Sequence, residues 1–184
     1  TTPRYHCAPT PVLQYNGRLY KAFENVKNDA LPGMRGYTSF VVSVDIDKDL
    51  MVASNWTKSN EVSFDGGWDP PGSNATTGWL EGNAVAGPDG QIWNILRVNS
   101  TPFHSRSAMI KIDDNGSNAT FNTDDFITFP GGQCKFVIRQ DPQTDIYWAM
   151  LNATPDVATQ RNILELHASK DLRSLILSFS LIPI

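Results

Sequence analysis

The sequence lacks the long apolar runs that a membrane-spanning helix needs. None of its 184 residues belongs to an uninterrupted apolar stretch of about eighteen residues. Basic excess is also missing, because 15 Lys and Arg residues stand against 19 Asp and Glu residues and leave a formal charge of -4. Binding to phosphate backbones needs a clustered positive field. We therefore expect neither a membrane span nor a nucleic-acid partner.

Cysteine is scarce, with only Cys7 and Cys134 in the chain. Two cysteines in an extracellular protein usually pair, and a disulfide here would close most of the chain into one loop. Two free thiols are the alternative. The three histidines, His6, His104 and His167, join no Cys or carboxylate residues at metal-ligand spacing. We therefore expect no metal and no cofactor.

A helical repeat is absent as well, since no segment of useful length keeps an apolar period of 3.6 residues. Apolar and polar residues alternate instead, in short runs bounded by turn residues. The Asn16-Gly17 pair between two such runs suits a type I′ hairpin turn, which needs positive φ at both central positions. The predicted strands cover residues 12–15, 18–23, 39–44, 80–86, 91–98, 108–112, 119–121, 135–139, 146–151 and 162–167.

Many short strands joined by hairpin turns predict an all-β fold, and a propeller-like array of antiparallel blades is favoured over a sandwich or a barrel. At about 40–45 residues a blade, the chain has material for about four blades. We expect residues 1–174 to form a single domain and residues 175–184 to form an apolar, uncharged C-terminal strand. That strand is covered by its own sheet, pairs with another copy of the chain, or ends a truncated chain.

Acceptor triplets for N-glycosylation, Asn-x-Ser/Thr, are frequent. They predict surface loops in a secreted protein, although chance enrichment in an Asn-rich chain is the alternative. Since the sequence opens at Thr1 without Met, we expect a processed or partial chain. The six acceptors are Asn55, Asn74, Asn99, Asn115, Asn118 and Asn152.

The densest chemical pattern is a pair of strands joined by Pro88-Asp89-Gly90, with Glu81 early in the first strand and Arg97 late in the second. In an antiparallel pair these two ends lie together, so Glu81 and Arg97 can share one rim. A guanidinium there can hold a substrate carboxylate, and a glutamate can act as a base or polarise a hydroxyl. A structural ion pair that caps the hairpin is the alternative.

This segment resembles the centre of the sialidase superfamily, the neuraminidase-like β-propellers with Asp-box repeats that cleave terminal sugars. The resemblance extends over most of residues 5–174. It implies that Glu81 is the glutamate that activates the nucleophile, and that Arg97 and Arg161 belong to the arginine triad that holds the sugar carboxylate. With Arg139 as a further substrate-binding candidate, we expect all four side chains to converge on one rim.

The chain also departs from that family. Ser169-Lys170-Asp171 opens like an Asp box, but the glycine and the closing aromatic residue are missing. No residue matches the first arginine, the acid/base aspartate or the tyrosine nucleophile of the family. We therefore expect a secreted, non-catalytic glycoprotein that binds glycans or assembles with other copies of itself. The alternative is an exo-acting glycoside hydrolase whose remaining catalytic residues lie outside this chain.

Overall fold

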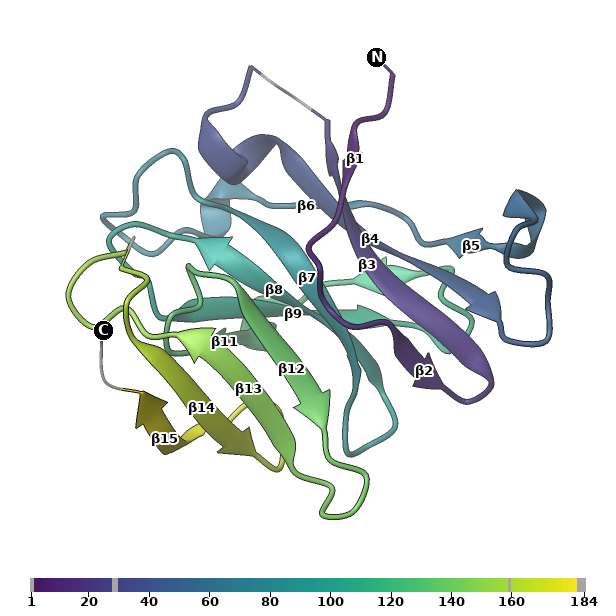
Figure 1. Cartoon of the computed structure of the whole chain (residues 1–184). Coiled ribbons are helices and arrows are strands. Elements are labelled where there is room, and N and C mark those ends of the chain that lie inside the picture. The colour runs from purple at the N-terminus through teal and green to yellow at the C-terminus, as the bar shows by residue number, and fades with distance from the viewer. Residues whose placement is uncertain (1, 28–29, 159, 182–184) are drawn as a thin grey trace.

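The computed structural model describes residues 2–27, 30–158 and 160–181, and within them all regular structure is β-strand or short 3-10 helix. None of these helices has the length and apolarity to cross a membrane. The strands form three antiparallel sheets that lie side by side along the chain, coloured purple and blue, teal, and green to yellow in Figure 1. The 3-10 helices are η1 (Gly33–Gly36), η2 (Ala53–Asn55), η3 (Gly66–Trp68) and η4 (Thr123–Asp125).

Each sheet is built from consecutive segments of the chain, as expected for the blades of a propeller. The first sheet contains β1 (Tyr5–His6), β2 (Leu13–Tyr15), β3 (Arg18–Val26), β4 (Tyr37–Asp45), β5 (Thr57–Lys58) and β6 (Val62–Ser63). The middle sheet contains β7 (Gly78–Ala86), β8 (Ile92–Asn99), β9 (Arg106–Ile112), β10 (Ala119–Thr120) and β11 (Phe126–Thr128). The third sheet contains β12 (Phe136–Gln140), β13 (Tyr147–Asn152), β14 (Leu164–Ser169) and β15 (Ile176–Leu181).

The middle sheet is covered on both faces, which explains why its strands are apolar at successive positions. In β8, Leu96 packs into the core shared with the first sheet, and the preceding residue Ile95 packs into the core shared with the third. Successive side chains of a strand point to opposite faces, so a strand between two cores is apolar throughout. All nine residues of β7 are accordingly buried.

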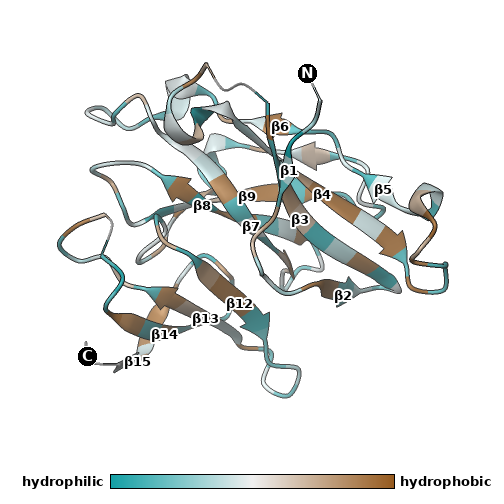
Figure 2. Cartoon of the chain, turned by 45° about the horizontal axis from the view of Figure 1, so that its top comes forward, coloured by the Kyte–Doolittle hydropathy of each residue, from teal (hydrophilic) through white to brown (hydrophobic). Residues whose placement is uncertain are grey.

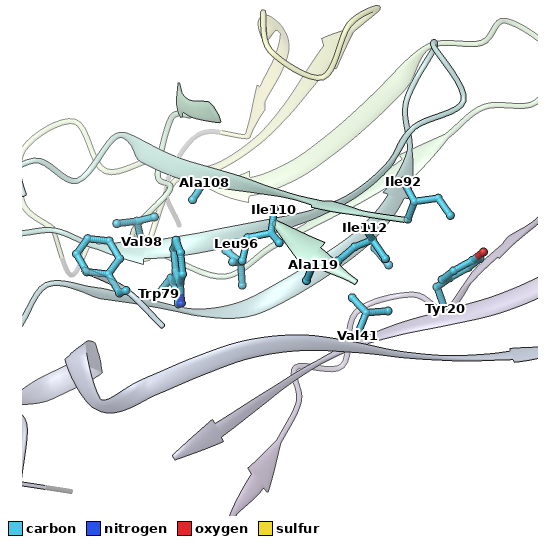
Figure 3. Close-up of a cluster of buried hydrophobic side chains, with 12 residues drawn as sticks. Tyr20, Val41, Trp79, Ile92, Leu96, Val98, Ala108, Ile110, Ile112 and Ala119 are labelled. Carbon is cyan, nitrogen blue, oxygen red and sulfur yellow. The ribbon is translucent and has the colours of Figure 1, made fainter. Parts of the chain in front are cut away.

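Figure 3 shows the first of these cores, where Tyr20 and Val41 of the first sheet face the side chains of the middle sheet around Trp79. Trp79 is fully buried and lies within 5.2 Å of the Phe64 ring and 5.1 Å of the Phe121 ring, measured between centroids. Figure 2 shows the same separation by hydropathy, with brown residues along the strands and teal or white ones in most loops.

The predicted hairpins are present. Asn16 and Gly17 have φ values of 46° and 73°, and Tyr15 pairs with Arg18 across them, as a two-residue turn with positive φ requires. The all-β propeller-like fold is therefore as predicted. The described residues form three sheets rather than four, because residues 46–56 and 64–77 are spent on long connections that contain no strand.

The C-terminal segment forms an ordinary last strand. β15 pairs antiparallel with β14, although its outer side chains stay open, with Ile176 70% and Phe179 57% exposed. Residues 182–184 of the predicted strand lie outside the described residues.

The predicted disulfide is wrong, because Cys7 and Cys134 are both free thiols. Cys134 is fully buried in the turn before β12, and its Sγ lies 3.4 Å from the carbonyl oxygen of Gln160 and 3.8 Å from that of Ala158. Cys7 is exposed in the N-terminal segment that follows β1. Sequence spacing cannot show that one thiol faces the interior while the other faces solvent.

This arrangement predicts unequal thiol reactivity. Native protein treated with iodoacetamide without reductant should take up one equivalent quickly, at Cys7, and a second only after denaturation. Cys134 is protected by burial, which also raises the pKa of its thiol and so lowers its thiolate fraction. Mass spectrometry of the alkylated peptides measures this. If neither cysteine reacted until reductant was added, a disulfide would exist and the structure would be incorrect here.

Candidate functional site

The candidate site begins at a β-bulge in β7. Leu80 pairs with Arg97 and Asn83 pairs with Ile95, so Glu81 and Gly82 together face the single residue Leu96. Glu81 has a φ of +56°, a conformation that costs a residue with a side chain free energy. Strain of this kind persists only where the surroundings hold the residue in place, and the contacts of Glu81 do so.

Both carboxylate oxygens of Glu81 are occupied by cations. Arg97 Nη1 donates to Oε2 at 2.8 Å, and Lys135 Nζ lies 3.1 Å from Oε1. Burial of Glu81, which is 6% exposed, raises its pKa, but Arg97 and Lys135 outweigh burial and bring the pKa below its ordinary value. Glu81 is therefore a fixed anion at neutral pH.

The segment before β12 supplies the rest of this arrangement. Arg97 Nε donates to the carbonyl oxygen of Gln133, whose side chain accepts from the Ser100 amide at 3.2 Å and donates to Asn99 at 2.6 Å. The middle and third sheets are thus joined at this rim. Sequence reasoning predicted the Glu81–Arg97 contact but missed Lys135, which no motif marks and which only the packing of the third sheet brings here.

A second glutamate, Glu24 of β3, binds the other side of the bulge. Its side chain is fully buried, and Oε1 accepts the amide of Gly82 at 3.0 Å while Oε2 lies 2.8 Å from Nδ1 of His6. Burial raises the pKa of Glu24, and the hydrogen bonds from Gly82 and His6 oppose it only in part. The alternation of β3, with buried Tyr20 and Ala22 at the same phase as Glu24, was the available sequence signal.

The other two predicted arginines behave differently. Arg161 is exposed, but its charge, like that of Arg97, acts to lower the pKa of the Cys134 thiol, so both lie near the buried turn before β12. Arg139 does not join them. It lies four residues after Lys135 in an extended segment, about 13 Å along the strand. There it lines a separate hollow with residues 11–14 and 84–86.

A hollow of about 250 Å³ lies beside Lys135, between the N-terminal segment and the third sheet. Its walls are mostly apolar, and Lys135, 56% exposed on its side chain, provides the cation at its edge. A small ligand such as one sugar ring with an acidic group suits this combination. The other lining residues are Ala8, Pro9, Thr10, Phe136, Val137, Met150, Leu151, Asn152 and Leu164.

The six glycosylation acceptors fall into two groups. Asn74, Asn115 and Asn118 are exposed in turns, and Asn55 is half-buried in η2. Asn99 and Asn152 are instead half-buried within β8 and β13, so the expectation of surface loops is wrong for these two. Period-two strand signals overlap the triplets at both positions, and only the sheets show that the strand wins. Among the described residues, no three His, Cys, Asp or Glu side chains gather as a metal site.

Comparisons with known proteins give no family by sequence, since no family model matches and no curated protein matches. Three solved structures resemble the fold. They are the exo-β-1,3-galactanase of Phanerochaete chrysosporium (10% identity, TM-score 0.59, 94% of this chain and 37% of that one), the exo-inulinase of Aspergillus awamori (14%, 0.59, 96% and 37%) and the sialidase of Trypanosoma rangeli bound to the inhibitor DANA (12%, 0.53, 97% and 28%).

The chain thus spans between about a quarter and two fifths of the length of these three proteins. At such low identity the likeness concerns the fold alone. It agrees with the three sheets seen here: this chain has the propeller-like fold of glycoside hydrolases.

Proposed function

We propose that this chain is a secreted, non-catalytic carbohydrate-binding protein that holds the carboxylate of a terminal acidic sugar at the rim around Glu81. The ligand class comes from the cations of the rim and from the resemblance of Glu81, Arg97 and Arg161 to the sialidase site. The single observation that carries the proposal is the double ion pair of Glu81 with Arg97 and Lys135.

The charge balance of the rim supports an anionic ligand. Arg97, Lys135 and Arg161 provide three cations near two carboxylates, and one of these, Glu24, is fully buried. This positive excess occurs in a chain whose formal charge is -4. Because Glu81 holds the Arg97 guanidinium and the Lys135 ammonium in place, a ligand carboxylate meets donors that are already oriented.

The state of the two glutamates supports a non-catalytic role. Glycoside hydrolysis needs one carboxyl group that gives a proton and another group that attacks or activates water. Glu81 is ionised with both oxygens engaged, and Glu24 has no exposed surface with which to touch a sugar. Of the carboxylates that the structure places at this rim, neither is free to exchange a proton with a ligand.

Secretion, glycosylation and self-assembly belong to the same proposal. The exposed acceptors Asn74, Asn115 and Asn118 support a glycosylated extracellular protein. The uncharged strand β15, with Ile176 and Phe179 exposed, supports contact with another copy of the chain.

One observation favours a second candidate, an exo-acting glycoside hydrolase completed by residues outside this chain. Two of the similar structures are named as exo-acting enzymes, and this chain spans only 37% of each. In such a protein the rim described here would be one part of a larger site.

Titration calorimetry with 3′-sialyllactose, and with lactose as the neutral control, tests the proposal. Wild-type protein should bind the acidic sugar and not lactose. Replacing Lys135 with Met should weaken binding about tenfold, which corresponds to one charge-assisted hydrogen bond. Lys111→Met, which removes an exposed lysine from β9, is the matched control and should bind like the wild type.

Equal affinity for lactose, or no effect of Lys135→Met, would contradict the acidic-sugar proposal. A fluorogenic aryl sialoside distinguishes the two candidates, because turnover would support the hydrolase and binding without turnover supports the non-catalytic protein.

A further inference from the structure

His6 and Glu24 form a pair of the kind that orients an imidazole. They are direct cross-strand partners in the β1–β3 register, and Nδ1 lies 2.8 Å from Glu24 Oε2. The Glu24 side chain is fully buried, whereas that of His6 is 45% exposed. Because one edge of the ring contacts a buried group, the exposed part is the opposite edge, which carries Nε2.

The hydrogen bond selects one tautomer of the imidazole. An ionised carboxylate only accepts hydrogen bonds, so Nδ1 carries the hydrogen of a neutral ring and Nε2 keeps a lone pair. Within the described residues, Nε2 has no hydrogen-bond partner, and the nearest ring is that of Tyr37, edge-on with centroids 6.5 Å apart. The ring therefore presents an acceptor that the protein does not use.

The pair lies next to the rim around Glu81. The carboxylate that binds His6 also accepts the amide of Gly82, the second residue of the bulge. Thr10, which lines the hollow beside Lys135, donates to the carbonyl of the same Gly82 at 3.0 Å. One carboxylate group thus separates His6 from the backbone that carries Glu81.

We propose that His6 is a ligand-binding residue of this rim, whose Nε2 accepts a hydrogen bond from a sugar hydroxyl, and that Glu24 is the positioning residue that holds His6 in the required tautomer. The inference rests on the proposed function, since it names the hydroxyl contact of the same site. The Glu81 cations then recognise the acidic group of the ligand, and His6 recognises a hydroxyl beside it.

Nitrogen-15 NMR of the histidine rings tests the tautomer without any ligand. In wild-type protein at neutral pH, His6 should carry its hydrogen on Nδ1. Glu24→Gln should move the hydrogen to Nε2, because the Gln carbonyl oxygen can still accept the Gly82 amide while its NH₂ group then donates to Nδ1. Amide dispersion shows that the variant is folded. A hydrogen on Nε2 in the wild type, or no change in Glu24→Gln, would overturn the assignment.

Calorimetry with 3′-sialyllactose tests the ligand contact. His6→Phe should bind about tenfold more weakly than the wild type, whereas Tyr5→Phe, which alters the neighbouring residue on the opposite face of β1, should bind equally well. Binding that Lys135→Met weakens but His6→Phe leaves unchanged would overturn this inference alone. A wild-type protein that binds no acidic sugar would overturn the proposed function and this inference together.

Discussion

Replacing Glu81 with Ala is expected to lower the free energy of unfolding by about 3–5 kcal/mol, because the change leaves the cations that it holds without their shared anion. Arg97 is the costlier of the two, since its side chain is only 14% exposed, whereas Lys135 can turn into water. Urea unfolding followed by tryptophan fluorescence measures the loss. The same variant should lose binding of acidic sugars, because the guanidinium is no longer held at the rim.

The pH dependence gives a sharper test of the same contact. Glu81 has a pKa below its ordinary value in the folded protein, so its contribution is present above the unfolded-state pKa and is lost as pH falls through the folded-state pKa. Glu81→Gln should therefore be less stable than the wild type at neutral pH, and the difference should shrink in acid. Glu24, whose pKa is raised, has the opposite sign: its ionisation costs stability as pH rises through the folded-state value. A difference that grows in acid would contradict the assigned state of Glu81.

Replacing Gly82 with Ala is expected to destabilise the protein by about 2–3 kcal/mol, the range for forcing atoms into a packed interior. An added Cβ would lie 2.0 Å from Oδ1 and 2.8 Å from Cγ of Asn94, far inside contact distance. Asn94 is fully buried and donates to the Ser39 hydroxyl at 2.9 Å, so its side chain cannot turn away without losing that bond. Thermal or urea unfolding measures the effect.

A double-mutant cycle identifies the cause. Asn94→Ala removes the obstructing amide, so Gly82→Ala should cost less than about 1 kcal/mol in that background. Gly67→Ala in η3 is the matched control, since its Cβ would meet only Asp65 Oδ1 at an ordinary 3.4 Å. An equal cost of Gly82→Ala with and without Asn94 would show that the overlap is not the reason.

The contact between Glu81 and Arg97 was predictable because it is local. A short turn joins their strands, and the antiparallel register brings the two ends together whatever the rest of the chain does. The bulge that tilts Glu81 was not predictable, since no sequence pattern marks a residue with positive φ other than Gly, Asn or Asp. The order of the strands and the turn at Asn16-Gly17 belong to the same local class.

Arg139 and Cys134 show where local reasoning ends. Arg139 was grouped with Arg97 and Arg161 as a cation of the third sheet, yet its place along β12 separates it from Lys135 at the start of that strand. Cys134 was paired with Cys7 on counting alone, whereas the packing of the third sheet buries one thiol and leaves the other in solvent. In both cases the deciding quantity is a distance between segments far apart in the chain.

Alternation and turn chemistry act over a few residues, and the amino-acid order by itself therefore determined the all-β class, the strand pairs and the Glu81–Arg97 neighbourhood. The docking of three sheets against one another decided the rest: the arrival of Lys135 and Glu24 on either side of the bulge, the orientation of His6, and the burial of Cys134. Such contacts depend on how two apolar faces fit, and that fit is a property of the assembled cores rather than of any one segment.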